Sequence, residues 1–186
     1  APSGWVLFQD AFNDPESGWI ESDDPDGRRG YADGAYRFTI QRANWYYWAS
    51  PRLRFSDIHV DVEITRLGGD GVSAQGIFCR FQDEGNFYAF TISSDGYTGI
   101  SKFVDGQETL LGEKVLKANA DIIQGDARNF VGVDCIDDQL RMWVNGVEAL
   151  AVRDSSYATG EAGIIGAVLE GESAVIEFDN FSIIKP

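Results

Sequence analysis

Three runs of β-branched and aromatic residues in the middle of the chain constrain its fold most. They lie within residues 72–104. Asp83-Glu84-Gly85-Asn86 separates the first run from the second, and 94–96 (Ser-Asp-Gly) separates the second from the third. Runs of this composition between turn residues are typical of consecutive antiparallel strands. The sequence therefore predicts a three-stranded antiparallel unit at the centre of the fold.

The same pattern continues on both sides of this centre. Residues 58–64 alternate between apolar and polar side chains, and Asn145-Gly146 is a strong signal for a hairpin. The polar residues 21–30 are expected to form a surface loop, and residues 112–128, which lack a period of two, a long loop or a short helical turn. About a dozen strands at this spacing predict an all-β protein, either a two-sheet antiparallel sandwich or a barrel.

Length and charge narrow the class of protein further. The chain has 186 residues, which suits one all-β domain over residues 1–186. No run approaches the roughly 20 apolar residues of a membrane helix. The net charge of −15 argues against binding to nucleic acid or to anionic membranes, both of which favour basic surfaces. The acidic residues serve solubility, or some of them hold Ca²⁺.

Both cysteines lie in predicted strands and in phase with apolar neighbours. Cys79 alternates with Ile77 and Phe81, and Cys135 lies in a run of alternating valines. Both thiols are therefore expected to point inward, where a disulfide across neighbouring strands is feasible. Such a bridge predicts an extracellular or periplasmic location, whereas two free buried thiols would suit a cytosolic protein.

Several segments together resemble a known family. Residues 77–102, 129–149 and 157–183 are similar, in content and order, to the concanavalin A-like, laminin-G-like jelly-roll domains. The nearest likeness is to the subgroup described as 3-keto-disaccharide-hydrolase-like, or of unknown function. It extends from residues 8–12 (FQDAF) to residues 178–181 (FDNF). The resemblance implies two stacked sheets, one of them concave, in proteins that often meet carbohydrate outside the cell. Such proteins include lectins, carbohydrate-binding modules and glycoside hydrolases, so the fold does not select an activity.

No catalytic residues are predicted. Retaining glycosidases need two carboxyl groups about 5 Å apart, and the related family-16 hydrolases carry them in an E-x-D-x-x-E motif. The nearest matches begin at Asp61 and at Glu177, and neither is followed by the second Glu. Asp61 and Glu63 share one strand face with the only histidine, His59, which is expected to be a surface residue. G-x-S-x-G is also missing, so a serine nucleophile has no support.

A sugar site is predicted on the face opposite the cysteines. That face mixes aromatic and polar residues, and sugars stack on aromatic rings while polar groups bind their hydroxyls. We expect this outward face to be concave and to hold a shallow carbohydrate site. The candidate ligand-binding residues are Arg80, Tyr97 and Trp143, with Trp45 or Trp48 at an edge. The alternative is that a loop such as 112–128 covers Phe78 and Phe87, which would then form a minor core.

The resemblance also implies a structural Ca²⁺ between the first and last strands. Asp10 and Asp179 match the positions where the carboxylate ligands occur, and backbone carbonyls can supply other oxygens. The alternatives are that both aspartates bond to turn backbone, or that residues 23–26 bind the ion instead.

Three functions follow from these observations. The leading interpretation is a secreted, non-catalytic jelly-roll module that binds carbohydrate, either as a monomer or as part of a larger secreted protein. The second is a glycoside hydrolase-like enzyme, and the third is a structural or adhesion domain without a small ligand. We expect no nucleic-acid partner and no membrane insertion.

Overall fold

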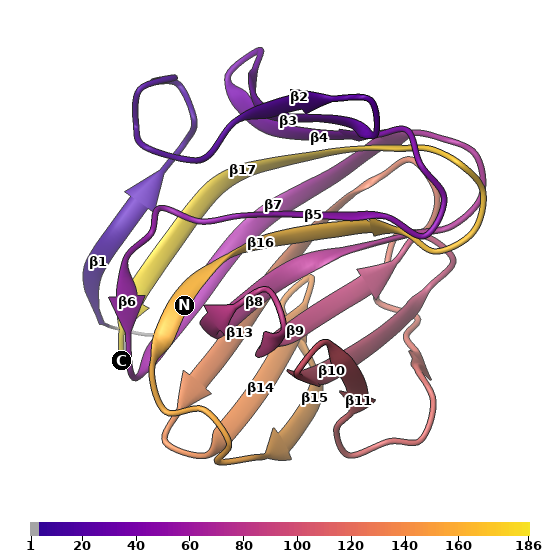
Figure 1. Cartoon of the computed structure of the whole chain (residues 1–186). Coiled ribbons are helices and arrows are strands. Elements are labelled where there is room, and N and C mark those ends of the chain that lie inside the picture. Colours follow the sequence, from indigo (N-terminus) through magenta and orange to yellow (C-terminus); the bar gives the residue numbers. More distant parts are fainter. Residues whose placement is uncertain (1–3) are drawn as a thin grey trace.

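The computed structural model describes residues 4–186, which form two antiparallel sheets stacked face to face (Figure 1). The nine-stranded sheet has the order β15 (Val147–Arg153), β14 (Gln139–Val144), β13 (Arg128–Ile136), β7 (Ile58–Gly68), β17 (Ala174–Lys185), β4 (Ala35–Ile40), β3 (Gly27–Ala32) and β2 (Ser22–Asp24), and β1 (Trp5–Asp10) pairs with β17. The eight-stranded sheet has the order β11 (Gln107–Leu110), β10 (Tyr97–Val104), β9 (Asn86–Ser93), β8 (Ser73–Asp83), β16 (Gly160–Val168) and β5 (Tyr46–Ala49). Two short strands extend it, β12 (Lys117–Ala118) on β10 and β6 (Arg54–Phe55) on β16.

This arrangement confirms the predicted all-β, two-sheet antiparallel sandwich. The central unit is β8–β9–β10, and the side chain of Asp83 closes its first turn by accepting from Gly85 N (2.8 Å) and Asn86 Nδ2 (2.8 Å). Within residues 4–186 there is no helix, and therefore none that could cross a membrane.

The main core lies between the two sheets, and the disulfide crosses it. Cys79 of β8 is bonded to Cys135 of β13, and both are fully buried. The predicted disulfide and its inward position are confirmed. The bridge joins facing sheets, however, and not neighbouring strands of one sheet as expected, because alternation indicates which side a residue faces but not which sheet it belongs to.

Two polar segments form strands that the sequence does not reveal. Residues 21–30 were expected to be a loop, but β2 and β3 form a hairpin that pairs with β4. Gly27 makes the close approach possible, because a Cβ there would lie 2.0 Å from Thr39 O. An edge hairpin depends on backbone hydrogen bonds more than on apolar side chains, so its sequence shows little alternation of apolar and polar residues. Residues 112–128 are mainly a loop, and only Lys117–Ala118 pairs with β10.

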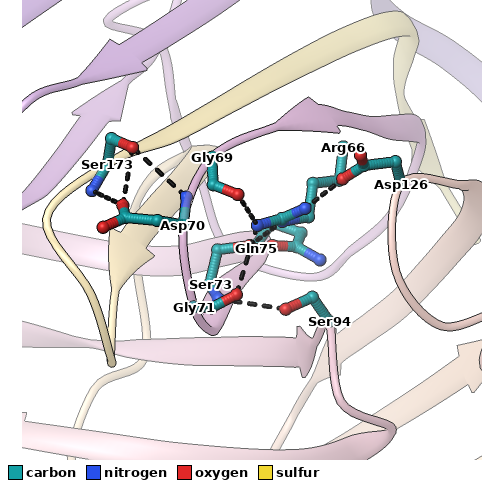
Figure 2. A network of polar contacts seen from close by, with 9 residues as sticks. All are labelled: Arg66, Gly69, Asp70, Gly71, Ser73, Gln75, Ser94, Asp126 and Ser173. Carbon is teal, nitrogen blue, oxygen red and sulfur yellow. Dashed lines mark hydrogen bonds and ion pairs between the residues drawn. The ribbon is translucent and has the colours of Figure 1, made fainter.

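A buried arginine ties together the loops at one end of the sandwich (Figure 2). Arg66 donates to Ser73 Oγ (3.1 Å), to two carbonyls of the β7–β8 turn and to the carboxylate of Asp126. In the same network Asp70 accepts from the backbone and side chain of Ser173 (both 2.7 Å). These bonds hold the start of β8 in place, and β8 continues directly into the groove described next.

Candidate functional site

A row of small side chains crosses the outward face of the eight-stranded sheet between two tyrosines. Tyr46 of β5 is opposite Ala167, Ala167 is opposite Ala74, and Ala74 is opposite Ser93. Tyr97 follows in β10, where its backbone N donates to Ser93 Oγ (3.0 Å). Tyr46 and Tyr97 are 40% and 41% exposed. Four strand spacings separate their backbones by about 19 Å, so the row forms a trough with an aromatic ring at each end.

One wall of this trough comes from β11 and the segment that follows it. A Cβ at Gly99 would lie 2.6 Å from Leu116 Cδ2 and 3.1 Å from Leu110 Cδ2, so both leucines lean over the sheet at that glycine. Because Gly99 has no side chain, the two leucines can lie over the sheet. They turn an open sheet face into a groove of about 860 Å³.

The groove is lined by both apolar and polar side chains. Its floor includes Ala74, Ala89 and Ile165, and its polar lining residues are Asn44, Thr91, Ser93, Ser101, Glu108, Thr109, Glu113 and Lys114. Ser101 donates to Glu108 Oε1 (2.6 Å), which orients one of the two carboxylates at the rim. The groove can therefore offer ring stacking at its ends and hydrogen bonds along its side.

A small aromatic core lies at the end of the groove away from the tyrosine row. Phe78, Phe81 and Phe87 are buried there, and Phe87 stacks on Phe103 at 4.5 Å between ring centroids. The alternative prediction, that Phe78 and Phe87 form a minor core, is therefore correct. These rings cover one another and do not need the 112–128 loop.

The two candidate edge tryptophans have different positions. Trp45 is half-buried and lines the groove, with the Arg42 guanidinium 4.4 Å from the centre of its ring. Trp48 packs on Phe81 at 4.8 Å as part of the minor core, and Arg29 lies 5.3 Å from its ring. Only Trp45 thus remains beside Tyr97 as a predicted residue at the groove.

Arg80 does not reach the predicted sugar surface. It is 1% exposed, and its guanidinium donates to Asp137 O (2.6 Å), Tyr157 O (2.8 Å) and Asp57 Oδ1 (3.3 Å). Arg80 has a φ of 51° and lies in a β-bulge. The bulge shifts the register of β8 against β9 and turns Phe81 toward the minor core. The expectation that Arg80 is exposed and that Phe81 faces the main core is therefore wrong, because alternation cannot anticipate a bulge.

Trp143 lies on the opposite outer surface of the molecule. It belongs to β14 of the nine-stranded sheet, whereas Tyr97 belongs to β10 of the eight-stranded sheet. The single outward face that was predicted is in fact two faces, with Phe78 and Thr91 on one and Asp134 and Trp143 on the other. The structure therefore does not bring Trp143 into the groove.

His59 is buried between two carboxylates, and the expectation of a surface residue is wrong. It is 6% exposed, with Nδ1 2.7 Å from Asp134 Oδ1 and Nε2 3.1 Å from Asp61 Oδ2. Burial lowers the pKa of His59, but the bonds to both carboxylates outweigh it and raise the pKa from 6.5 to about 9. The imidazolium ties β7 to β13, and both of its nitrogens are engaged, so it has no free nitrogen to act as a general base.

Each of the predicted metal ligands has hydrogen-bond partners of its own. Asp10 accepts from Phe12 N (2.7 Å) and Trp19 Nε1 (3.0 Å), while Asp179 accepts from Asn180 N (2.7 Å). In the register of the sheet, Asp10 is opposite Phe181 and Asp179 is opposite Glu63. Over residues 4–186, no three His, Cys, Asp or Glu side chains are grouped to hold a metal ion. Both aspartates accept hydrogen bonds from nearby residues, and Ca²⁺ binding at this pair stays a prediction.

The groove residues that sequence reasoning missed are mostly small. Ala74 and Ala167 matter because they leave space, and a small side chain carries no pattern of its own. The available signal was their outward phase, two residues from Gly76 and from Ile165.

Comparisons with known proteins give the fold and no closer relative. No protein-family model and no curated protein matches the sequence. Among solved structures, the carbohydrate-binding module CBM66 from Bacillus subtilis is 18% identical, with a TM-score of 0.61 over 90% of this chain and 96% of that one. A B. subtilis protein of unknown function with a galectin-like fold is 11% identical, with a TM-score of 0.72 over 99% and 97% of the two chains.

A third similar structure is an enzyme. The β-glucanase of Bacillus licheniformis is 9% identical, with a TM-score of 0.67 over the full length of both chains. At these identities the likeness concerns the fold alone. Together with the strand order and the core, it establishes that this chain is a jelly-roll domain of the concanavalin A-like fold.

Proposed function

We propose that the groove between Tyr46 and Tyr97 binds a carbohydrate chain and that the protein is a non-catalytic binding module. The observation that carries this proposal is the row Tyr46–Ala167–Ala74–Ser93–Tyr97. Two exposed rings at the ends of a floor of small side chains leave room for a flat ligand. The hydroxyl, amide and charged side chains that line the groove suit a ligand rich in hydroxyl groups.

Two further observations support this assignment. The B. subtilis structure named above is a carbohydrate-binding module, and the B. licheniformis structure is a glucanase, so sugar recognition occurs on this fold. A buried disulfide suits an extracellular or periplasmic location, where such ligands occur. Glu108, Glu113 and Lys114 line the groove together, so its balance of charge favours a neutral glycan over a polyanion.

The binding module is preferred over a hydrolase because of where the groove carboxylates lie. Glu108 and Glu113 are exposed, one on the edge strand β11 and the other in the segment after it. A glycosidase needs two carboxyl groups that flank the scissile bond. Both glutamates are on the same side of the groove, and the opposite side is formed by Trp45 and Tyr46.

A glycan array tests the proposal directly. The variants Tyr46→Ala and Tyr97→Ala remove the two end rings, and Trp5→Ala is a matched control because Trp5 is 83% exposed on β1 of the other sheet. We expect each groove variant to bind about tenfold more weakly, equivalent to about 1.4 kcal/mol, and the control to bind as the wild type. A folded double variant that keeps the wild-type glycan signal would contradict the proposal. Release of new reducing ends from the bound glycan would favour the hydrolase.

A further inference from the structure

A second hollow lies on the outward face of the nine-stranded sheet, centred on Gly132. In the register of the sheet, Gly132 is flanked by Trp143 on β14 and Asp61 on β7. A Cβ at Gly132 would lie 2.7 Å from Asp61 Oδ1 and 3.5 Å from His59 Cε1. The missing side chain therefore opens a space between the tryptophan and the carboxylate, and the hollow measures about 670 Å³.

Two aromatic side chains form its walls. Trp143 is half-buried, and Phe130, two residues before Gly132 on β13, is 51% exposed. A phenyl ring so exposed in the middle of a paired strand makes little contribution to the core. Phe130 and Trp143 both line the hollow above the glycine.

The base of the hollow has a fixed negative charge. Asp61 and Asp134 hold His59 between them, and Glu63 lies 3.4 Å from Arg128 Nη1. Arg141, whose guanidinium lies 4.9 Å from the centre of the Trp143 ring, is paired with Glu148. His59 is positively charged, so four carboxylates against three cations leave one negative charge in and around the hollow. Asp61 uses Oδ2 for His59, which places Oδ1 on the side of Gly132. The buried imidazolium thus fixes the direction of a half-exposed carboxylate.

We infer that this hollow binds an organic cation, namely an ammonium or guanidinium group carried on an apolar stem or ring. The carboxylate of Asp61 would accept hydrogen bonds from the cation. Because Arg141 already lies against the Trp143 ring, the exposed ring of Phe130 would be the main face that contacts the stem and attracts its charge, with Trp143 as the second wall. The hollow presents carboxylate acceptors and aromatic faces, which favours a cation over a neutral sugar. The site lies on the opposite surface from the groove and does not depend on the proposed function.

Chemical-shift perturbation in a ¹⁵N-labelled sample of the full chain tests this inference, observed at the Gly132 amide and the Trp143 indole. The probes are two matched pairs, Nα-acetyl-lysine amide against Nα-acetyl-norleucine amide, and glucosamine in its protonated form against glucose. We expect saturable shifts with millimolar affinity for the charged member of at least one pair and none for its neutral partner. Tighter binding of the lysine amide would identify a protein side chain as the source of the cation, and tighter binding of glucosamine would identify an amino sugar.

Three variants localise the effect. Asp61→Asn and Phe130→Ala should each weaken binding of the charged probe by about threefold to fivefold, and Phe130 is exposed enough for its variant to fold. Tyr97→Ala in the groove should bind as the wild type. Equal shifts from charged and neutral probes, or no shift from either charged probe, would overturn the inference. So would wild-type affinity in both the Asp61 and the Phe130 variant.

Discussion

Cys79 of β8 and Cys135 of β13 are bonded to each other through the middle of the core, so a covalent link joins the sheet that carries the groove to the sheet that carries the Gly132 hollow. The two candidate sites lie on opposite outer surfaces of one cross-linked sandwich. Each can therefore be altered from its own surface without a change to the shared core.

The first prediction concerns this disulfide. The bridge spans 56 residues, so the loop-entropy model gives roughly 4 kcal/mol of stabilisation. The double variant Cys79→Ala/Cys135→Ala should lower the free energy of unfolding in urea by about that amount while it keeps glycan affinity under conditions where it is folded. A double variant within about 1 kcal/mol of the wild type would show that the core holds the sheets together without the bond.

Arg80 should affect stability and not ligand affinity. Its guanidinium is buried and donates to two backbone carbonyls, so Arg80→Met leaves buried acceptors without donors. We expect a loss of about 2–4 kcal/mol in the free energy of unfolding. Arg153→Met is the control, because Arg153 forms an exposed ion pair with Asp138 and should change stability by less than about 1 kcal/mol. Equal losses in the two variants would contradict the structural role of Arg80.

The stability of the protein should fall as pH rises through the titration of His59. The pKa of His59 is about 9 in the folded state and 6.5 as its reference value, so the folded state holds this proton more tightly. The resulting stabilisation is complete below about pH 6.5 and is lost as pH rises toward 9. It amounts to on the order of 2 kcal/mol once solvent around Asp61 is allowed for. Urea unfolding across this range should show the decline in the wild type and a much smaller decline in His59→Gln.

The floor of the groove should tolerate no larger side chain. Ala167 lies between Tyr46 and Ala74 with its side chain outward, so Ala167→Leu fills the space that the proposed glycan needs. We expect at least a tenfold loss of glycan affinity with little change in the free energy of unfolding. Ala151→Leu on the exposed edge strand β15 is the matched control. Retained affinity in the folded Ala167 variant would place the ligand elsewhere.

Calcium binding stays a prediction from the sequence resemblance. If Ca²⁺ stabilises the protein through Asp10 and Asp179, the melting temperature should rise with added Ca²⁺ and fall with a chelator, and Asp179→Asn should remove this response. The bonds from Asp10 to Phe12 and Trp19 give the alternative, in which Asp10→Asn lowers stability equally with and without the ion. A melting temperature that neither additive changes would count against the metal.

The sequence predicts the fold well because alternation reports burial directly. Ile77, Cys79 and Cys135 were expected to face the core, and all three are fully buried there. The prediction was wrong at Arg80 and Phe81, where a bulge changes the phase of the strand. Alternation is a local property, so a local irregularity is enough to defeat it.

The candidate site was harder to predict, for a different reason. Tyr97 and Trp143 both point outward, and only the order of strands shows that they lie on opposite surfaces. Strand order depends on contacts between distant segments, which a single sequence does not display. The pairing of His59 with Asp134 could not be predicted for the same reason, because Asp134 lies 75 residues further along the chain.

The most direct test of glycan binding in the groove is to map the bound glycan on the structure. The glycan with the strongest array signal would be titrated into ¹⁵N-labelled protein and the backbone amide shifts recorded. We expect the largest shifts at Ala74, Ser93, Tyr97 and Ala167, on the face of the eight-stranded sheet. Shifts centred on Gly132 and Trp143, with the groove amides unchanged, would show that the glycan does not bind in the groove.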